Sequence, residues 1–349
     1  MRILIDIGHP AHVHLFRPFA KMMTGRGHKV LFTLREKEFE KALLDAAGFD
    51  YISMGRKRKG FLGKALGLLL FDWKEWRIAR RFRPDVLMSH GSMYAAHAAW
   101  LLGRPHISFE DTYNMEQIRL YEPFTSVILT GDYPHPVISK KELHIPAYHE
   151  LAYLHPAVFT PDRSVLGQLG VSEGGRYVLL RFVSWGATHD AGHKGMSLEN
   201  KREAVKRFSK YARVFISSES PLPADLEHYR LPTPPERIHD VLAFASLVFG
   251  ESATMVSEGA VLGVPGVYLD NTGRYYTAEQ ESRYGLCFNY TESPEDQALA
   301  IAKGEEILRA GADFSAARAR LLEDKIDLSS WLVNYVEDYV ARLYSGKIR

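Results

Sequence analysis

The chain has 349 residues, of which 46% are hydrophobic and 25% are charged. This length allows two domains of ordinary size, and the composition excludes a disordered chain. The formal net charge of +2 gives no general basis for binding nucleic acid, so no nucleic-acid partner is expected. The single cysteine, Cys287, excludes an internal disulfide and favours a reducing compartment.

The first residues, MRILIDIGHP, predict a strand followed by a turn, which is not the pattern of a signal peptide. No segment reaches the roughly 18 to 20 apolar residues that a membrane span requires. We therefore expect the protein in the cytoplasm.

The first half of the chain predicts alternating strands and helices. An apolar strand over 2–7 precedes a polar turn over 8–14 and a helix over 15–26. Strands follow at 29–34, 51–54, 86–89, 106–109 and 127–130, and helices at 36–47, 62–82 and 93–102. This order is typical of a doubly wound parallel sheet, whose ligands gather at the carboxyl ends of the strands.

A connector rich in proline, histidine and tyrosine is expected over 143–162, and the alternation resumes at 177–182. The predicted fold class is α/β, with two Rossmann-like doubly wound domains facing a cleft. We place the domains at 1–162 and 163–325, followed by a long amphipathic helix over 326–344. No internal sequence repeat is evident.

The stretch GESATMVSEGAVLGVP, residues 250–265, predicts a helix that opens at the carboxyl end of a buried strand. Ser252 and Thr254 are residues that cap helices, and a helix start of this kind suits a phosphate. Glu258 lies one turn further in, where a carboxylate can bind two ribose hydroxyls. The alternative is an ordinary βαβ unit with Glu258 exposed to solvent.

This stretch resembles the donor site of GT-B glycosyltransferases, including the lipid II-forming N-acetylglucosaminyltransferase. The resemblance implies that Ser252, Ala253 and Thr254 bind the diphosphate of a nucleotide sugar, with a UDP-sugar favoured, and that Glu258 binds the ribose. The segment NTGRYYTAEQESRYG resembles the pair that holds the donor sugar, which implies that role for Glu279 and Gln280. The resemblance also implies that the terminal segment, 326–349, packs back on the first domain.

The first turn, GHPAHVHLFRP, contains His9, His12 and His14. An imidazole at the carboxyl end of a strand can take a proton from an attacking hydroxyl. No Cys, Asp or Glu lies near at ligand spacing, so neither a metal nor another cofactor is expected. The alternative for His9 and His14 is a hydrogen bond to backbone groups of the turn. The spacing of His12 to the Gly27–His28 pair resembles that of the catalytic loop histidine in plant-type glycosyltransferases, which implies that His12 is the base.

Polar residues also follow two other predicted strands. Glu110, Asp111 and Tyr113 come after the strand that ends at residue 109, where they could assist His12 or, together with His9, bind acceptor hydroxyls. The alternative is that Asp111 caps the following turn. Arg181, in the strand over 177–182, is a candidate diphosphate clamp because its guanidinium makes forked bonds to phosphate oxygens.

Residues 56–83 combine ten lysines and arginines with only two acids, and they interleave tryptophans at helical spacing. A basic amphipathic helix of this kind attracts an anionic membrane, here the inner face of the plasma membrane. The alternative is a helix packed on the core with a solvated basic side.

A wider resemblance, to a microbial family of predicted glycosyltransferases, covers nearly the whole chain through IDIGHPAHVHLFRP, GSMYAAHAAWLLGRPHISFEDT and RFVSWGATHDAGHKG. It implies a GT-B fold and the glycosyltransferase class, often associated with surface polysaccharide synthesis. We expect transfer of a sugar from a nucleotide-diphosphate sugar to a hydroxyl acceptor, in surface polysaccharide or glycolipid synthesis, with a lipid-linked acceptor as one alternative. No Asp-x-Asp metal motif is evident, so we expect this transfer to be metal-independent. Two rival functions remain. One is non-hydrolysing UDP-N-acetylglucosamine 2-epimerisation, in which Glu110 and Asp111 would move protons at the sugar, and the other is nucleotide-sugar binding without turnover.

Overall fold

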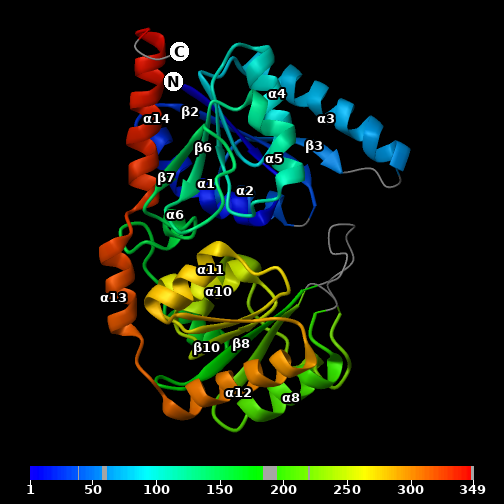
Figure 1. Ribbon diagram of the computed structural model, residues 1–349, viewed down its shortest axis with the longest axis vertical. Coiled ribbons are helices and arrows are strands. Elements are labelled where there is room, and N and C mark those ends of the chain that lie inside the picture. Colours follow the sequence, from blue (N-terminus) through cyan, green and yellow to red (C-terminus); the bar gives the residue numbers. More distant parts are fainter. Residues whose placement is uncertain (38, 57–60, 184–194, 219–220, 347–349) are drawn as a thin grey trace. The chain divides into compact units, whose positions relative to one another are not determined.

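The computed structural model describes residues 1–37, 39–56, 61–183, 195–218 and 221–346, with the backbone alone described over 61–66. The chain divides into two compact units (Figure 1). The first comprises Met1–Tyr153 with Ile326–Arg349, and the second comprises Leu154–Lys325. The first unit therefore ends earlier than the boundary expected at residue 162.

The first unit is built on a seven-stranded sheet with the order β3-β2-β1-β4-β5-β6-β7. Every pairing between neighbours is parallel. Its strands are β1 (Arg2–Ile7), β2 (Lys29–Glu36), β3 (Tyr51–Arg56), β4 (Val86–His90), β5 (His106–Phe109), β6 (Val127–Gly131) and β7 (Glu142–Ile145). The strand order reverses between β1 and β4, so the carboxyl ends of these two strands flank a switch point where ligands commonly bind.

Helices surround this sheet. They are α1 (Pro10–Gly25), α2 (Glu40–Ala47), α3 (Phe61–Phe82), α4 (Met93–Leu101), α5 (Met115–Tyr121), α6 (Leu151–Leu154) and α14 (Leu328–Tyr344). The polar turn expected over 8–14 is wrong beyond residue 9, because α1 already begins at Pro10. His9 Nδ1 accepts a hydrogen bond from the Ala11 N–H at 3.2 Å, and proline suits the first position of a helix. His12 and His14 therefore lie on a helix. The sequence also did not predict α5 or β7.

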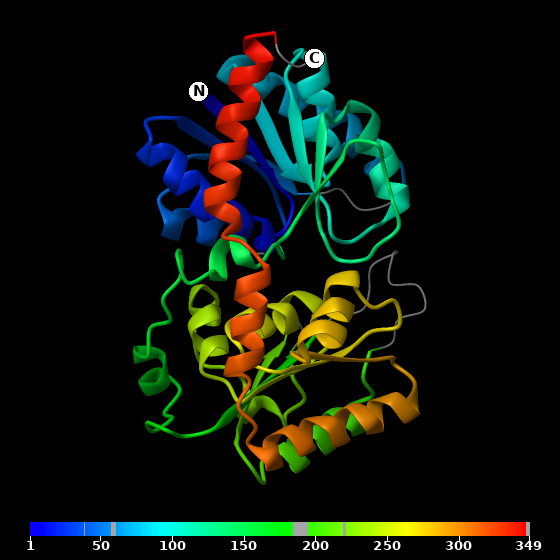
Figure 2. The same ribbon diagram turned by 60° about the vertical axis from the view of Figure 1, so that its left-hand side comes forward.

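Helix α14 belongs to the first unit, where it packs along α1 (Figure 2). Asp327 caps its start by accepting from the N–H groups of Ser329 and Ser330 at 3.1 and 3.2 Å. Glu337 pairs with Arg26 Nη1 at 2.6 Å and with His28 Nε2 at 2.8 Å, just beyond the end of α1. These contacts fix the helix to the residues that connect α1 to β2.

The second unit has a five-stranded parallel sheet with the order β12-β11-β10-β8-β9. Its strands are β8 (Tyr177–Phe182), β9 (Arg213–Ser218), β10 (Leu247–Gly250), β11 (Gly266–Leu269) and β12 (Cys287–Tyr290). Its helices are α7 (Ser164–Gln168), α8 (Leu198–Phe208), α9 (Ile238–Ala243), α10 (Ala253–Leu262), α11 (Tyr275–Glu279), α12 (Pro294–Ala310) and α13 (Ser315–Asp324). Figure 1 shows α8 and α12 side by side on one face of this sheet, with α10 and α11 on the other face.

The two units contain matching β-α-β segments, 87–112 and 247–272, whose residue numbers differ by 160 throughout. The identical pairs are Leu87 and Leu247, Ser92 and Ser252, Leu102 and Leu262, Gly103 and Gly263, Pro105 and Pro265, and Thr112 and Thr272. In each segment the serine caps its helix and the glycine that ends the helix has a positive φ. This match corrects the expectation that the sequence holds no internal repeat.

The matching segments also end in the same turn. Glu110 and Asp270 each accept hydrogen bonds from the N–H and the hydroxyl of the threonine two positions on, and from the next N–H. The residue that donates this last N–H has a positive φ, 56° at Tyr113 and 63° at Gly273. The acidic residue therefore shapes the turn at the carboxyl edge of both sheets.

Candidate active site

A cluster of titratable side chains lies at the carboxyl edge of the first sheet, where the neighbouring strands β1, β4 and β5 end. His12 comes from the first turns of α1, His90 is the last residue of β4, Asp111 follows β5, and His149 lies between β7 and α6. We refer to these four residues as the histidine–aspartate cluster. Parallel strand order brings together residues that are far apart in sequence.

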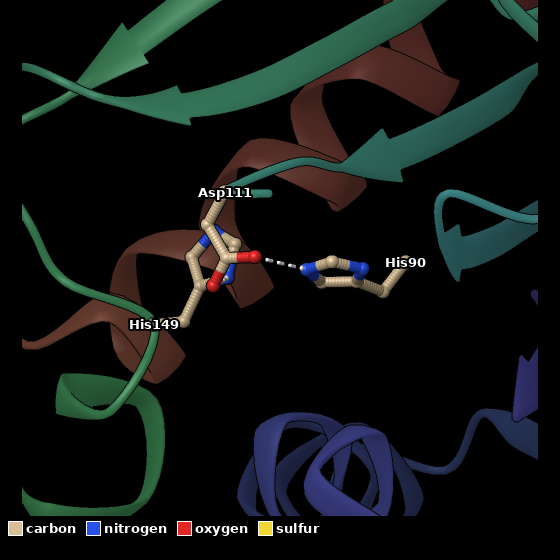
Figure 3. A group of neighbouring side chains, drawn as sticks. All are labelled: His90, Asp111 and His149. Atoms are coloured by element: carbon tan, nitrogen blue, oxygen red, sulfur yellow. Dashed lines mark hydrogen bonds and ion pairs between the residues drawn. The ribbon is translucent and has the colours of Figure 1, made fainter. Parts of the chain in front are cut away.

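The Asp111 carboxylate lies between two imidazoles (Figure 3). Its Oδ1 is 3.0 Å from His90 Nε2, and its Oδ2 is 3.1 Å from His149 Nδ1. The His12 ring stacks on the His90 ring, with centroids 4.7 Å apart and planes inclined by 22°. Asp111, which is expected to assist His12, is linked to it through His90, because both carboxylate oxygens face other histidines.

The cluster contains both a charged and a neutral imidazole. Burial alone would lower the pKa of His90, but the Asp111 carboxylate outweighs it and raises this pKa to about 9. Burial and the neighbouring His90 hold the pKa of His12 well below its ordinary value. Burial alone would raise the pKa of Asp111, but His149 and His90 hold it well below its usual range. At neutral pH the cluster therefore comprises a carboxylate, an imidazolium at His90 and a neutral His12.

The hydrogen bond from the Gly8 N–H to His12 Nδ1, at 3.3 Å, fixes which nitrogen of this neutral ring carries the proton. Because Nδ1 accepts, the proton lies on Nε2. The Gly8 bond is long for an N–H donor. Taking a proton from a substrate at Nδ1 would require His12 to release Gly8.

Glu110 has a structural role in the turn after β5. Its Oε1 accepts three hydrogen bonds from Thr112 and Tyr113, and its Oε2 accepts one from the Tyr121 hydroxyl at 2.6 Å. The side chain is 1% exposed. The prediction that Glu110 contacts the acceptor is therefore corrected. The turn is capped by Glu110 and not by Asp111, for which this role was the alternative.

The other predicted acceptor contacts lie around this edge. The His9 ring is 6.0 Å from the His12 ring, and its Nδ1 caps α1. Tyr113 adopts a left-handed backbone conformation, and its ring lies 4.5 Å from the ring of His135. His14 is buried against Tyr153, at 5.6 Å between ring centroids.

In the second unit, helix α10 starts directly after the carboxyl end of β10. Ser252 accepts a hydrogen bond from the Met255 N–H at 3.3 Å, as its predicted capping role requires. Gly250, at φ 147°, is required in this turn because a Cβ there would lie 2.0 Å from the Arg181 carbonyl oxygen. Arg181 and Gly250 are register partners on β8 and β10, so this arginine lies beside the start of α10. Its Nη1 donates to Ser217 Oγ at 2.9 Å.

Glu258 is 5% exposed rather than facing open solvent, and its Oε1 lies 2.9 Å from His239 Nε2. Glu279 is also buried, with Lys325 Nζ 3.0 Å from its Oε2. Gln280 is fully buried, donating to Ser257 Oγ at 2.7 Å and accepting from Cys287 Sγ at 3.1 Å. The prediction that Gln280 contacts the donor sugar is corrected, because both ends of its amide are used inside the unit.

Two groups among the described residues have the side chains and proximity to hold a metal ion. They are His90, Asp111 and His149, and His135, Glu142 and His144. In the first group each carboxylate oxygen already faces an imidazole nitrogen at hydrogen-bonding distance. The sequence also predicts that the glycine-rich loop with His189, Asp190 and His193 closes over a ligand, but these residues lie outside the described part of the chain.

Helix α3 presents one apolar and basic stripe to solvent. Leu69 and Trp73 are 69% and 49% exposed, and Arg77 and Arg81, at successive intervals of four residues, are also exposed. Arg77 lies over the Trp73 ring at 5.2 Å. A cavity of about 510 Å³ beside this helix is lined by apolar residues and by the cations of Arg2, Lys74, Arg77 and Arg81. No helix in the described residues is both long and apolar enough to span a bilayer.

Sequence reasoning did not select His90 or His149. His90 ends a predicted strand, and carboxyl ends of parallel strands are where site residues gather, so its position carried a signal. His149 carried none, because it lies in a connector without periodicity.

No family model and no curated protein matches the chain. Solved structures do match it along nearly its whole length. A Listeria monocytogenes protein proposed to be a UDP-N-acetylglucosamine 2-epimerase aligns with a TM-score of 0.71 and 12% identity, over 100% of this chain and 97% of that one. The S. aureus MnaA–UDP structure aligns at 0.68 and 10%, over 97% of both chains. The spinosyn forosaminyltransferase SpnP aligns at 0.65 and 15%, over 98% and 99%.

These solved neighbours include GT-B glycosyltransferases and UDP-N-acetylglucosamine 2-epimerases. Together with the two parallel sheets, they confirm the predicted α/β GT-B fold. At identities of 10 to 15% the likeness extends to the fold alone.

Proposed function

We propose that the protein is a glycosyltransferase that moves a sugar from a nucleotide-diphosphate sugar, with a UDP-sugar favoured, to a hydroxyl acceptor. The observation that carries this proposal is the histidine–aspartate cluster at the carboxyl edge of the first sheet. It combines a neutral imidazole, which can accept a proton, with an imidazolium held by a carboxylate. The GT-B fold and the UDP bound in the MnaA neighbour support the proposed class of donor.

The donor site is proposed at the start of α10. The first N–H groups of this helix, at Ala253 and Thr254, and the adjacent Arg181 would bind the diphosphate, and Ser252 holds the turn. Glu258 would bind the ribose, with His239 orienting its carboxylate. Glu279, held by Lys325, is the remaining candidate for the sugar.

In the proposed chemical step, His12 accepts the proton of the acceptor hydroxyl. The acceptor oxygen forms a bond to the anomeric carbon, the bond from that carbon to the diphosphate breaks, and the nucleotide leaves with the electron pair. His12 takes the hydroxyl proton after its Nδ1 releases the Gly8 N–H. Positive charge at α10 and Arg181 would stabilise the leaving diphosphate, by a few kcal/mol in comparable sites. The chain has no Asp-x-Asp motif, so we propose that transfer needs no metal.

Epimerisation is the second candidate function, because epimerases are among the solved neighbours. That reaction would use carboxylates such as Glu110 and Asp111 at the sugar. Glu110 accepts three hydrogen bonds within its turn and one from Tyr121 on α5, and Asp111 is held between two histidines. These contacts favour transfer over epimerisation.

We also propose peripheral contact with an anionic membrane through α3, which would place the enzyme where glycolipids and lipid-linked acceptors for surface polysaccharide are found. The support is the exposed stripe of Leu69, Trp73, Arg77 and Arg81. Tryptophan beside cations suits the interface of an anionic bilayer.

One experiment separates these functions. The protein is incubated with UDP, GDP, CMP and dTDP sugars, with and without a panel of hydroxyl acceptors, and the products are identified by NMR. Transfer predicts nucleotide release that depends on the acceptor and is lost in His12→Ala. Formation of UDP-N-acetylmannosamine from UDP-N-acetylglucosamine alone would establish epimerisation. Binding without either product would support a protein that does not turn over.

A further inference from the structure

We infer that His135, on the β6–β7 connection of the first unit, and Glu142 and His144, on β7, form a binding site for a divalent transition metal such as Zn²⁺. The three residues come from one short stretch of chain and do not overlap the histidine–aspartate cluster. This inference does not depend on the proposed function.

The central observation is that the Glu142 carboxylate is buried and that only one of its two oxygens accepts hydrogen bonds from the residues that the structure describes. Its side chain is 4% exposed, and its Oε1 accepts from the N–H groups of Ile138 and Ser139 at 2.5 and 2.7 Å. Its Oε2 is buried without a hydrogen-bond partner among the described residues. A buried carboxylate oxygen without a partner is costly, and an ion is one of the few ways to satisfy it.

Two imidazole nitrogens face this oxygen at equal distances. His135 Nδ1 and His144 Nε2 each lie 3.9 Å from Glu142 Oε2. A direct hydrogen bond would bring these atoms to about 2.7 to 3.2 Å. Two ligands that each lie about 2.0 to 2.2 Å from a tetrahedral zinc ion are about 3.3 to 3.6 Å apart, so each histidine would move a few tenths of an ångström toward Glu142 when the ion binds.

The surroundings of His144 suit a metal ligand. Its Nδ1 lies 3.2 Å from Thr130 Oγ1, its register partner on β6. A histidine that binds a metal through one nitrogen usually donates a hydrogen bond from the other, and Thr130 can accept it. His135 Nδ1 lies 2.9 Å from the carbonyl oxygen of Pro136, and its Nε2 lies 3.3 Å from that of Gly131. Binding an ion through Nδ1 would replace the first hydrogen bond, while Nε2 can keep donating to Gly131. The His144 side chain is 50% exposed, so an ion can reach the group from solvent.

Two histidines and one carboxylate are ligands that zinc accepts, and a water molecule can complete a tetrahedron. Because the ring of His135 packs 4.5 Å from the ring of Tyr113, the ion would hold the β6–β7 connection beside the turn that carries Asp111. Its role would be structural, so it is compatible with metal-independent transfer.

The test measures zinc binding to tag-free, metal-depleted full-length protein by calorimetry with ZnCl₂, with stoichiometry checked by elemental analysis after dialysis. His144→Ala removes an exposed ligand, so the fold should survive. Asp111→Asn addresses the other candidate group, and His228→Ala is a matched exposed histidine in the second unit.

We expect the zinc stoichiometry to fall by one in His144→Ala and to stay at the wild-type value in Asp111→Asn and His228→Ala. Thr130→Val should weaken zinc binding by about tenfold or more, through loss of the hydrogen bond to His144. Zinc should raise the melting temperature of the wild type and of His228→Ala, but not that of His144→Ala. No zinc binding by the wild type, or a stoichiometry unchanged in His144→Ala, would overturn the inference.

Discussion

The imidazole rings of His12 and His90 lie face to face, 4.7 Å apart between centroids, and only the second is paired with a carboxylate. The positive charge that Asp111 maintains on His90 therefore disfavours a second charge on His12. This relationship keeps His12 neutral, as a proton acceptor must be, but it also makes His12 a weak base. The protonation states of the two rings are therefore coupled.

The first prediction concerns this coupling. After burial, the positive charge on His90 contributes most to the lowered pKa of His12. His90→Gln removes this charge, so the pKa of His12 should rise toward its ordinary value. NMR titration of labelled histidines would follow both rings in the wild type, where His90 should titrate near 9. A His12 pKa that does not change in His90→Gln would show that burial alone sets it.

The second prediction concerns stability in acid. His106 is fully buried, and burial lowers its pKa to about 3. The unfolded chain binds a proton near pH 6.5, so the stability contributed by this group is present above that pH and is lost as the pH falls toward 3. Between pH 7 and pH 5 this loss should be about 2 kcal/mol in the free energy of unfolding.

The variant His106→Asn cannot take up that proton, so its free energy of unfolding should fall less over the same range. Denaturant titrations at several pH values would measure the difference. His228→Ala, at an exposed histidine, is the control and should follow the wild type. Parallel curves for His106→Asn and the wild type would contradict the assignment of a buried neutral imidazole.

The third prediction concerns Glu75, one of the two acids counted in the basic segment. It is fully buried on α3, and burial, with Asp6 second, raises its pKa well above 4.5. The protonated group contributes its full stabilisation to the folded protein below about pH 4.5. As the pH rises through the pKa of Glu75 in the folded protein, this contribution to the free energy of unfolding is lost, by up to about 1.4 kcal/mol per pH unit. Glu75→Gln should therefore be close to the wild type at pH 4.5 and more stable than it at pH 7.5. The exposed control Glu116→Gln should show no such divergence, and a Glu75→Gln difference that does not depend on pH would refute the raised pKa.

The sequence predicted six of the seven strands of the first sheet, because buried parallel strands are short apolar runs bounded by turns. The sequence-based predictions were wrong where a side-chain hydrogen bond determines where a helix begins or how a turn is capped. His9 starts α1 earlier than periodicity indicated, and Glu110 took the turn-capping role that was considered for Asp111. These outcomes depend on hydrogen bonds to particular backbone groups, which spacing alone does not determine.

The candidate site was predictable only in part. Both His12 and Asp111 follow predicted strands, and the resemblance to plant-type glycosyltransferases indicates His12 as the base. Their link through His90 depends on the lateral order of β1, β4 and β5, which one sequence does not give. Gln280 was assigned to the sugar by motif, although its amide is fully buried. The repeat between the units was missed because few of its matched positions are identical.

The fourth prediction concerns the membrane. Arg77→Gln with Arg81→Gln should weaken binding to phosphatidylglycerol vesicles by roughly 30-fold, because each cation near an anionic surface contributes about 1 kcal/mol. The double variant Lys206→Gln with Lys210→Gln removes the same charge from exposed positions of the second unit and should bind like the wild type. Cosedimentation with anionic and with neutral phosphatidylcholine vesicles would measure this. Equal losses in both double variants would assign the binding to net charge and not to α3.

The most direct test of the central claim is calorimetric binding of UDP, GDP, dTDP and CMP to the wild type and to Glu258→Gln. Glutamine keeps an oxygen for His239 but loses the charge, so the fold should be retained, as a thermal melt would check. We predict that the wild type binds at least one of these nucleotides and that Glu258→Gln binds it at least tenfold more weakly, while His12→Ala binds it like the wild type. If no nucleotide binds the wild type, or if Glu258→Gln binds as tightly, α10 and Glu258 are not a nucleotide-sugar site.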